Sequence, residues 1–483
     1  MNIYQRFFKA GVLCVLPGAI WILSSAYMFK APAPSRQGPN ILVFIADDWG
    51  YPYAGIYGDT VVKTPNFDKL AKSGAVFTNV FTTPSCSPSR ASLLTGRWPH
   101  NLEQGVHLWG FIPDKFPNYT AKLAEQGYEV GLCRKGYGPG EYQLGGYANN
   151  PAGKGYRGFK EFYAAKPKDK PFCFWFGSLD PHRPYEKGSG VSAGKSLSSV
   201  KVPAFLPDRP EVRSDILDYH VEIERFDREM GDIIKMLEAA GELDNTLIVI
   251  TGDNGMPFPR AKANLYDAGT HVPLAIIWPG KIKPGQVLSD LVGFNDLAPT
   301  FLEATNQPPQ TAMSGKSLLP LVTGKVKSLG RDKMFVERER HARVREGNVG
   351  YPARGIRTND FLYIRNLRPE RWPAGDPKME SVQYGDIDDS PSKTYIMEHK
   401  DEPAIAPFFQ LAFQKRPAEE LYDLKNDPWQ LKNVAQDKKY ETIRGKLSGE
   451  LNNWMEATKD PRVNGGGDYL EQYPFTKAVS KMD

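Results

Sequence analysis

Histidine and cysteine are scarce in this chain, which contains seven histidines and four cysteines among its 483 residues. Zinc prefers histidine or thiolate ligands, and no two of these histidines share the spacing of a zinc site. The chain also lacks a run of lysine and arginine interleaved with aromatic residues, and its formal net charge of +5 is small for this length. We therefore expect no nucleic-acid partner.

The first 38 residues have the composition of an export signal followed by a linker. Arg6 and Lys9 precede an apolar run at 10–23, and the small residues at 24–26 fit a cleavage site. The alternative is a membrane anchor, because apolar character continues beyond that run and a spanning helix needs about 20 apolar residues. A proline inside the run and the small residues favour the cleaved signal. We expect a secreted or periplasmic protein that meets a membrane only through an uncleaved leader.

An exported protein raises the question of disulfides. Cys14 lies in the predicted leader, which leaves Cys86, Cys133 and Cys173, an odd number. Cys133 and Cys173 lie in apolar, strand-like segments, where a cysteine behaves as a small buried hydrophobic residue.

Cys86 lies instead in the polar stretch TTPSCSPSRASLLTGRW, at 82–98. The residues from Ser89 onward are compatible with a helix, so Cys86 is expected near a helix N-terminus, which lowers the pKa of a thiol. A reactive thiol is one interpretation of this stretch, and an inert cysteine in a turn is the other.

Continuous apolar runs at 40–48, 171–179, 246–255 and 272–280 predict strands of a mostly parallel sheet that is buried on both faces. Between the second and third runs, seven apolar residues from Ile216 to Leu237 recur at spacings of three and four, which predicts an amphipathic helix packed on such a sheet. Alternation of strands and helices indicates an α/β domain.

The pattern changes near residue 335. The segments 355–367 and 418–428 predict short, solvent-facing strands with turns between them, and 439–457 predicts a closing helix. We therefore divide the chain into a signal and linker at 1–38, a catalytic α/β domain at 39–335 and a smaller α+β subdomain at 336–483.

Two pairs of oxygen-bearing side chains directly follow buried strands. Asp47 and Asp48 end the first apolar run, and Asp253 and Asn254 end the third. Ligands of open α/β sheets bind beyond the carboxyl ends of the strands. Four such side chains suit a hard cation, Ca²⁺ or Mg²⁺. Each residue alone is equally compatible with a helix cap or a turn.

The run Cys86-Ser87-Pro88-Ser89-Arg90, followed by Leu94-Thr95-Gly96-Arg97, resembles the signature of type I sulfatases. In that family a maturing enzyme oxidises the cysteine to formylglycine. The resemblance extends from NILVFIADDWG to ELYDLKNDP. It implies the alkaline-phosphatase-like α/β fold, with a mixed, mostly parallel central sheet covered by helices and a smaller C-terminal α+β subdomain.

The resemblance also implies a metal site and a set of catalytic residues. Asp47, Asp48, Asp253 and Asn254 match the family's ligands for one calcium ion, and the modified Cys86 supplies another. The matches to catalytic side chains are Arg90, which steadies the formylglycine, Lys135 and Lys262, which bind the sulfate, and His182, which faces the leaving-group oxygen.

One position departs from the family pattern. The family carries a histidine two residues after the first lysine, and this chain has Tyr137 there. The base that releases sulfate is therefore left unassigned, with Tyr137 or a residue elsewhere taking that role. Arg183, His100 and His107 are further possible substrate contacts, although structural roles are favoured for them, and His271 is expected to pack or cap.

The segments 180–185 and 253–266 resemble the N-sulfoglucosamine sulfohydrolase branch of the family. We therefore predict hydrolysis of sulfate from sulfated glycans, with N-sulfoglucosamine as the favoured substrate and an O-sulfated sugar as the second. Two alternatives remain open. One is a phosphatase or phosphodiesterase of the same superfamily, and the other is a non-catalytic binder of sulfated glycans, which Tyr137 favours.

Overall fold

The computed structural model describes residues 38–379 and 382–476. The predicted signal peptide and linker at 1–38 lies outside the described residues, apart from Gly38. The central element is an eight-stranded sheet with the order β5-β4-β6-β1-β7-β8-β2-β9. Its strands are β1 (Asn40–Ala46), β2 (Ala75–Phe77), β4 (Glu129–Arg134), β5 (Lys154–Tyr156), β6 (Phe172–Gly177), β7 (Thr246–Gly252), β8 (Leu274–Ile277) and β9 (Gln286–Leu288).

The sheet is mixed and mostly parallel, as predicted. The five strands from β5 to β7 run parallel to one another, whereas β8 is antiparallel to both of its neighbours. Side chains of β1 alternate between two cores: Leu42 and Phe44 belong to one, Ile41 and Val43 to the other. A strand between two helix layers has no polar face, which explains its continuous apolar run.

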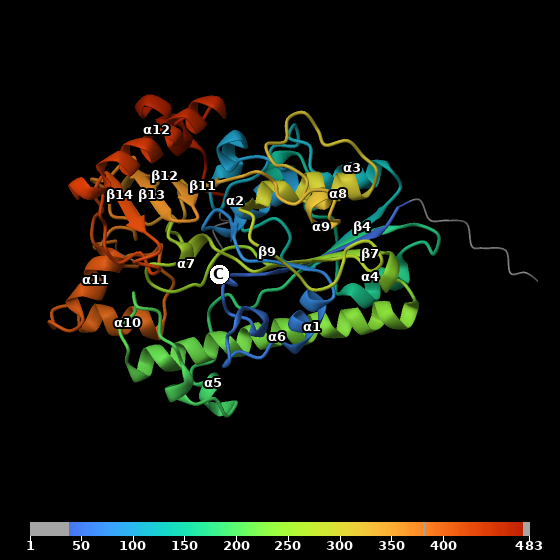
Figure 1. Cartoon of the computed structure of the whole chain (residues 1–483), viewed down its shortest axis with the longest axis horizontal. Helices are drawn as coiled ribbons and strands as arrows, with labels where there is room; N and C mark the ends of the chain where they lie inside the picture. Colours follow the sequence, from blue (N-terminus) through green and yellow to red (C-terminus); the bar gives the residue numbers. More distant parts are fainter. Residues whose placement is uncertain (1–37, 380–381, 477–483) are drawn as a thin grey trace, which may run out of the picture. The chain divides into compact units, whose positions relative to one another are not determined.

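Helices cover both faces of this sheet (Figure 1). The face of Leu42 packs against α1 (Pro65–Lys72), α4 (Phe159–Ala165) and the long α6 (Pro210–Ala240). The opposite face packs against α2 (Cys86–Thr95), α3 (Tyr119–Glu125), α8 (Leu297–Ala304) and α9 (Leu319–Val322). The remaining short elements of this part are β3 (Val80–Phe81), α5 (Ser189–Ser192), α7 (Asp267–Thr270) and β10 (Val292–Gly293).

A second, four-stranded antiparallel sheet forms the C-terminal part, with the order β11-β12-β13-β14. Its elements are β11 (Lys333–Arg338), β12 (Ala353–Thr358), β13 (Phe361–Asn366), α10 (Pro391–Glu398), α11 (Ala406–Phe413), β14 (Glu419–Asp423) and α12 (Glu441–Ala457). β11 crosses the boundary proposed between residues 335 and 336, and the division of the chain there stays a prediction.

The prediction that these strands face solvent is wrong. Ile356 and Tyr363 pack under α12, in a core that includes Leu451. Leu362 on the other face packs in a core that includes Leu265 of the first domain. The sheet is therefore covered on both faces, and some of the polar residues that suggested exposure form ion pairs, such as that of Arg357 with Asp267.

The three cysteines in the described part of the chain are free and buried, which confirms the prediction for Cys133 and Cys173. Among the described residues, no helix is long and apolar enough to cross a membrane.

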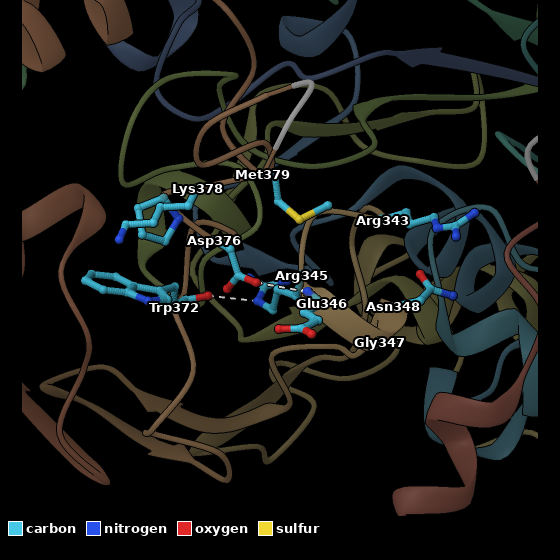
Figure 2. Close-up of a pocket in the computed structure, with 10 residues that line it drawn as sticks. Arg343, Arg345, Glu346, Gly347, Asn348, Trp372, Asp376, Lys378 and Met379 are labelled. Carbon is cyan, nitrogen blue, oxygen red and sulfur yellow. Dashed lines mark hydrogen bonds between the residues drawn. The ribbon is translucent and has the colours of Figure 1, made fainter.

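A cavity of about 1070 Å³ opens in the C-terminal part, between the segments 343–348 and 372–379 (Figure 2). Its lining includes both basic side chains, such as Arg343 and Lys378, and the acidic side chains of Glu346 and Asp376. Asp376 is engaged with the backbone, since it accepts a hydrogen bond from the amide of Glu346. This cavity contains none of the side chains predicted to carry chemistry.

Candidate active site

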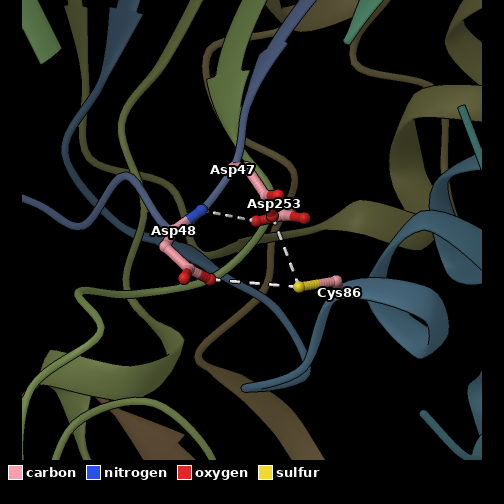
Figure 3. Close-up of side chains that lie close together, drawn as sticks. All are labelled: Asp47, Asp48, Cys86 and Asp253. Carbon is pink, nitrogen blue, oxygen red and sulfur yellow. Dashed lines mark hydrogen bonds between the residues drawn. The ribbon is translucent and has the colours of Figure 1, made fainter. Parts of the chain in front are cut away.

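The two predicted acidic pairs meet at one edge of the central sheet. β1 and β7 pair in parallel with Ala46 opposite Gly252, so the residues that follow them are neighbours. The backbone amide of Asp253 donates to the carbonyl of Ala46 at 2.9 Å, and the amide of Asp48 donates to Asp253 Oδ1 at 2.9 Å (Figure 3). The parallel pairing of two buried strands therefore places four oxygen-bearing side chains together.

The turn after β1 holds Asp48 in a strained backbone conformation. Its φ of 70° lies in the left-handed region, which L-residues other than glycine rarely adopt. Two hydrogen bonds fix this turn: the amide of Asp48 donates to Asp253, and the hydroxyl of Tyr219 on α6 donates to the carbonyl of Asp48 at 3.0 Å. Strained positions of this kind concentrate at functional sites, where the surrounding structure holds them.

Cys86 is the first residue of α2, three residues earlier than the helix predicted from Ser89. Its Sγ lies 3.4 Å from Asp47 Oδ1 and 3.9 Å from Asp48 Oδ1 (Figure 3). The expected lowering of its pKa is wrong, because burial and the Asp253 carboxylate raise the pKa of the thiol well above its usual value. The thiol is therefore neutral, and a neutral thiol is a poor nucleophile.

Arg90, one turn further along α2, links the helix to the ends of two strands. Its Nε donates to Asp253 Oδ2 at 2.8 Å, and its Nη1 donates to the carbonyls of Lys135 and Gly136 at 2.8 and 3.0 Å. The side chain is fully buried, so it positions these groups without contacting solvent.

Lysine and histidine side chains surround the carboxylates. Lys135 Nζ donates to both oxygens of Asp47, at 2.7 and 2.6 Å. Lys262 Nζ donates to Asp48 Oδ2 at 2.7 Å. Burial alone would raise the pKa of Asp47, but Lys135 and other nearby cations hold it well below its usual range. These ammonium groups mark a place where a polyanionic group such as sulfate can bind.

His182 presents one ring nitrogen to the same group. Its Nδ1 lies 2.5 Å from the carbonyl of Arg183, so Nδ1 carries a proton and donates it there. Its Nε2 lies 3.9 Å from Asp48 Oδ2. Since the side chain is 37% exposed, Nε2 is available for proton transfer.

The donor set fits a hard divalent cation. Ligand atoms of Asp47, Asp48, Cys86 and Asp253 all lie within 4.8 Å of one another. Asn254 Nδ2 donates to Asp48 Oδ1 at 2.7 Å, which turns its buried Oδ1 away from any partner among the described residues. An unpartnered amide oxygen beside three carboxylates is the ligand type that Ca²⁺ binds.

A second group, formed by Asp48, His182 and Asp388, also has the spacing of metal ligands. The ammonium of Lys262 already bridges two of its members, because it lies 2.7 Å from Asp48 and 3.1 Å from Asp388. Lys262 therefore supplies positive charge where a second cation would bind, and repulsion disfavours a two-metal centre.

Five of the predicted residues line a cavity of about 900 Å³: Asp47, Cys86, Lys135, His182 and Lys262. The C-terminal part contributes four wall residues, of which two, His341 and Asp388, carry polar side chains that sequence reasoning missed. The sequence around these two residues did not indicate that either one lies in the site. His341 lies in an arginine-rich segment after β11, and Asp388 lies in a polar stretch typical of a loop before a helix.

Tyr137 lies outside this cavity wall and in the core instead. Its side chain is 3% exposed, and its buried hydroxyl has no partner among the described residues. Asn150 fixes the backbone on both sides, accepting from the amide of Tyr137 and donating to its carbonyl. Tyr137 therefore has the position of the family histidine without its access to the reacting groups.

The three side chains considered as substrate contacts, His100, His107 and Arg183, have structural partners, and His271 packs as expected. His100 lies against Glu337 at 3.0 Å, and the ring of His107 lies 2.8 Å from the carbonyl of Leu470. His271 stacks on Tyr51 with ring centroids 4.0 Å apart. Arg183 lines the cavity, but its guanidinium is bonded to both oxygens of Asp215.

Comparison with known proteins identifies the family of this chain. The family model described as Sulfatase matches residues 39–165 and 154–307. The chain belongs to the sulfatase family. A second model, described as N-sulphoglucosamine sulphohydrolase, C-terminal, matches residues 260–402 of this sulfatase.

Named relatives extend over most of the chain. An ulvan-active sulfatase of Formosa agariphila is 30% identical over 451 residues, which covers 90% of this chain and 84% of the relative. Human N-sulphoglucosamine sulphohydrolase is 29% identical over 483 residues, which covers 90% of this chain and 93% of the relative. A structure solved with its substrate D-glucosamine-2-N,6-O-disulfate has a TM-score of 0.65 at 18% identity, covering 88% of this chain and 99% of that one, and supports the fold.

Replacement of Asn254 tests the metal site. Asn254→Ala removes the unpartnered amide oxygen, so we expect calcium affinity to fall by about tenfold or more, the effect typical of losing a group at a metal site. Isothermal titration calorimetry of the unmodified protein measures this. Asn245→Ala, in an exposed turn just before β7, is the matched control and should bind calcium as the wild type does. Equal affinity in both variants would remove Asn254 from the ligand set.

Tyr137→Phe tests whether the tyrosine hydroxyl takes part in the reaction. The hydroxyl is buried and unpartnered, so its removal leaves no group unsatisfied and kcat/KM should stay within about threefold of the wild type. Tyr351→Phe removes another buried hydroxyl without a partner and serves as control. A loss of about 100-fold for Tyr137→Phe, with an unchanged unfolding midpoint, would assign the hydroxyl to catalysis.

Proposed function

We propose that this chain is an exported enzyme that hydrolyses sulfate groups from sulfated glycans, with Cys86 oxidised to formylglycine by a maturing enzyme and one Ca²⁺ bound by Asp47, Asp48, Asp253 and Asn254. The observation that carries the proposal is the cluster of Cys86, three carboxylates and two lysines at one end of the cavity. The sulfatase signature around Cys86 and the composition of residues 1–38 support the modification and the export.

The surroundings of the Cys86 thiol argue against the unmodified cysteine as the nucleophile. A thiol whose pKa is raised by burial and a carboxylate is poorly suited to attack sulfur by itself. Formylglycine at position 86 would supply a hydrated aldehyde with a hydroxyl that attacks sulfur. A bound calcium ion would supply the positive charge that stabilises the ionised form of that hydroxyl. Arg90 holds the first turn of α2 against the strand ends. Residue 86 in that turn is therefore kept at a fixed distance from Asp47 and Asp48.

The remaining side chains bind the sulfate and move protons. Lys135 and Lys262 point their ammonium groups into the cluster, where they neutralise negative charge that develops on the sulfuryl oxygens. His182 anchors Nδ1 on a backbone carbonyl and leaves Nε2 to donate a proton to the leaving oxygen or nitrogen.

The substrate class rests on relatives rather than on geometry. Ulvan-active sulfatase and N-sulphoglucosamine sulphohydrolase are the names of two proteins that match most of this chain. We therefore keep N-sulfoglucosamine as the favoured substrate and an O-sulfated sugar of a polysaccharide as the second.

Cys86→Ala should reduce sulfate release to background, because alanine has no thiol for the maturing enzyme to oxidise to the aldehyde. The test uses protein expressed with a maturing enzyme, an aryl sulfate and an aryl phosphate assayed in parallel, and mass spectrometry of the Cys86 peptide. Cys133→Ala, which removes a buried cysteine of β4 in the core, should keep its activity. An unmodified thiol in an active protein, or a large preference for phosphate, would overturn the proposal.

His182→Ala should slow substrates with poor leaving groups by about 10²- to 10⁴-fold, the usual contribution of general acid catalysis, and affect activated aryl sulfates much less. The measurement is kcat/KM across aryl sulfates whose leaving groups differ in pKa. His399→Ala, in an exposed pair with Glu402, is the control. Equal losses across the series would remove His182 from the general-acid role.

A further inference from the structure

The cavity has two chemically different ends. At the inner end, Lys135 and Lys262 lie at the carboxylate cluster where the sulfate is proposed to bind. The adjoining wall comes from the C-terminal part, which contributes His341 and Asp388. A sugar whose sulfate binds at these lysines therefore has a carboxylate and an imidazole directly beside it.

Asp388 places a negative charge next to the sulfate position. Its Oδ2 lies 3.1 Å from Lys262 Nζ, and the side chain is 27% exposed. Burial would raise its pKa, but Lys262, His182 and His341 lower it to about 2, so the carboxylate is ionised at neutral pH. An ionised carboxylate accepts hydrogen bonds from sugar hydroxyl groups and repels a sulfate or another carboxylate.

His341 adds a neutral polar group to the same wall. The side chain is 4% exposed, and its Nδ1 lies 2.7 Å from the Ser85 hydroxyl, directly before Cys86. Burial lowers its pKa to about 4, so the ring is uncharged at neutral pH. Its Nε2 has no partner among the described residues and belongs to a side chain that lines the cavity. A neutral imidazole nitrogen suits a hydroxyl group and offers no charge to an anion.

Apart from the two lysines at the proposed sulfate position, the described wall of the cavity has two basic side chains, Arg183 and Arg225. Each lysine or arginine that lines it is already paired with a carboxylate: Lys135 with Asp47, Lys262 with Asp48 and Asp388, Arg183 with Asp215, and Arg225 with Asp180 and Glu222. Glu186, by contrast, is an exposed acid that lines the cavity and has no side-chain partner among the described residues. The rest of the wall therefore combines acidic groups with apolar side chains such as Trp109 and Leu179.

We propose that Asp388 and His341 bind the free hydroxyl groups beside the sulfate of a singly sulfated sugar residue, and that Asp388 excludes sugars with a second sulfate on a neighbouring carbon. This inference rests on the proposed sulfatase function and narrows its substrate class. It makes Asp388 a specificity-determining residue, because the lysine–metal end accepts any sulfate and the C-terminal wall selects the sugar that bears it.

The first test compares two sugars with the unaltered enzyme. One has a single sulfate and a free neighbouring hydroxyl, and the other has a second sulfate on that neighbouring oxygen. We expect kcat/KM to be at least about tenfold higher for the singly sulfated sugar, since a site built for a hydroxyl rejects an analogue that replaces it. Equal or better turnover of the doubly sulfated sugar would overturn the proposal.

The second test uses Asp388→Asn, which keeps the shape and removes the charge. On the singly sulfated sugar kcat/KM should fall about 10- to 100-fold, as expected for loss of a charged hydrogen bond. This loss should exceed the loss on an aryl sulfate by at least about tenfold. The ratio of kcat/KM for the singly sulfated sugar to that for the doubly sulfated sugar should also fall. Equal losses on both substrates would show that Asp388 acts through Lys262 and not through the sugar.

Asp389→Asn is the matched control, because its side chain is 86% exposed and pairs with Lys393. It should leave both activities and the unfolding midpoint unchanged. Failure of the proposed function is distinguishable, since it would appear as an enzyme that releases sulfate from neither an aryl sulfate nor either sugar. In that case, calorimetric binding of the two sugars to Cys86→Ser protein decides the inference, and tighter binding of the doubly sulfated sugar would overturn it.

Discussion

Three buried carboxylates at the ends of two strands determine how the rest of the site is built. Asp47, Asp48 and Asp253 are nearly excluded from water, and their mutual repulsion is offset mainly by cations brought from other elements. Arg90 arrives from α2, Lys135 from the end of β4, and Lys262 from the loop after β7. Each of these ion pairs fixes the position of the segment that carries the cation. The pairing that balances the buried charge therefore also sets the geometry of the catalytic centre.

The central sheet and its metal ligands follow from the sequence because both depend on local pattern. Strands covered on two faces must be continuously apolar, and the polar residues that end them must lie at one edge when the strands are parallel. The position of Asp253 beside Asp48 therefore required only the two runs and their direction. The signature around Cys86 likewise lies within one short segment.

Properties that depend on contacts distant in sequence could not be obtained in this way. The helix N-terminus suggested a lowered thiol pKa, but burial and Asp253 raise it, and neither is visible in the neighbourhood of Cys86 in the sequence. The C-terminal strands alternate like exposed strands, yet α12 and the first domain cover both of their faces. Asp388 and His341 reach the cavity only because the second sheet packs against the first domain.

The C-terminal part thus supplies cavity residues without supplying any ligand of the carboxylate cluster. All groups proposed to act on the sulfate lie between residues 47 and 262, whereas His341 and Asp388 come from segments beyond β11. Substitutions in those later segments can change the wall that faces the sugar while Asp47, Asp48 and Asp253 keep their cationic partners. A gene with this arrangement can acquire new substrates by altering its last third, with the chemical machinery under separate selection.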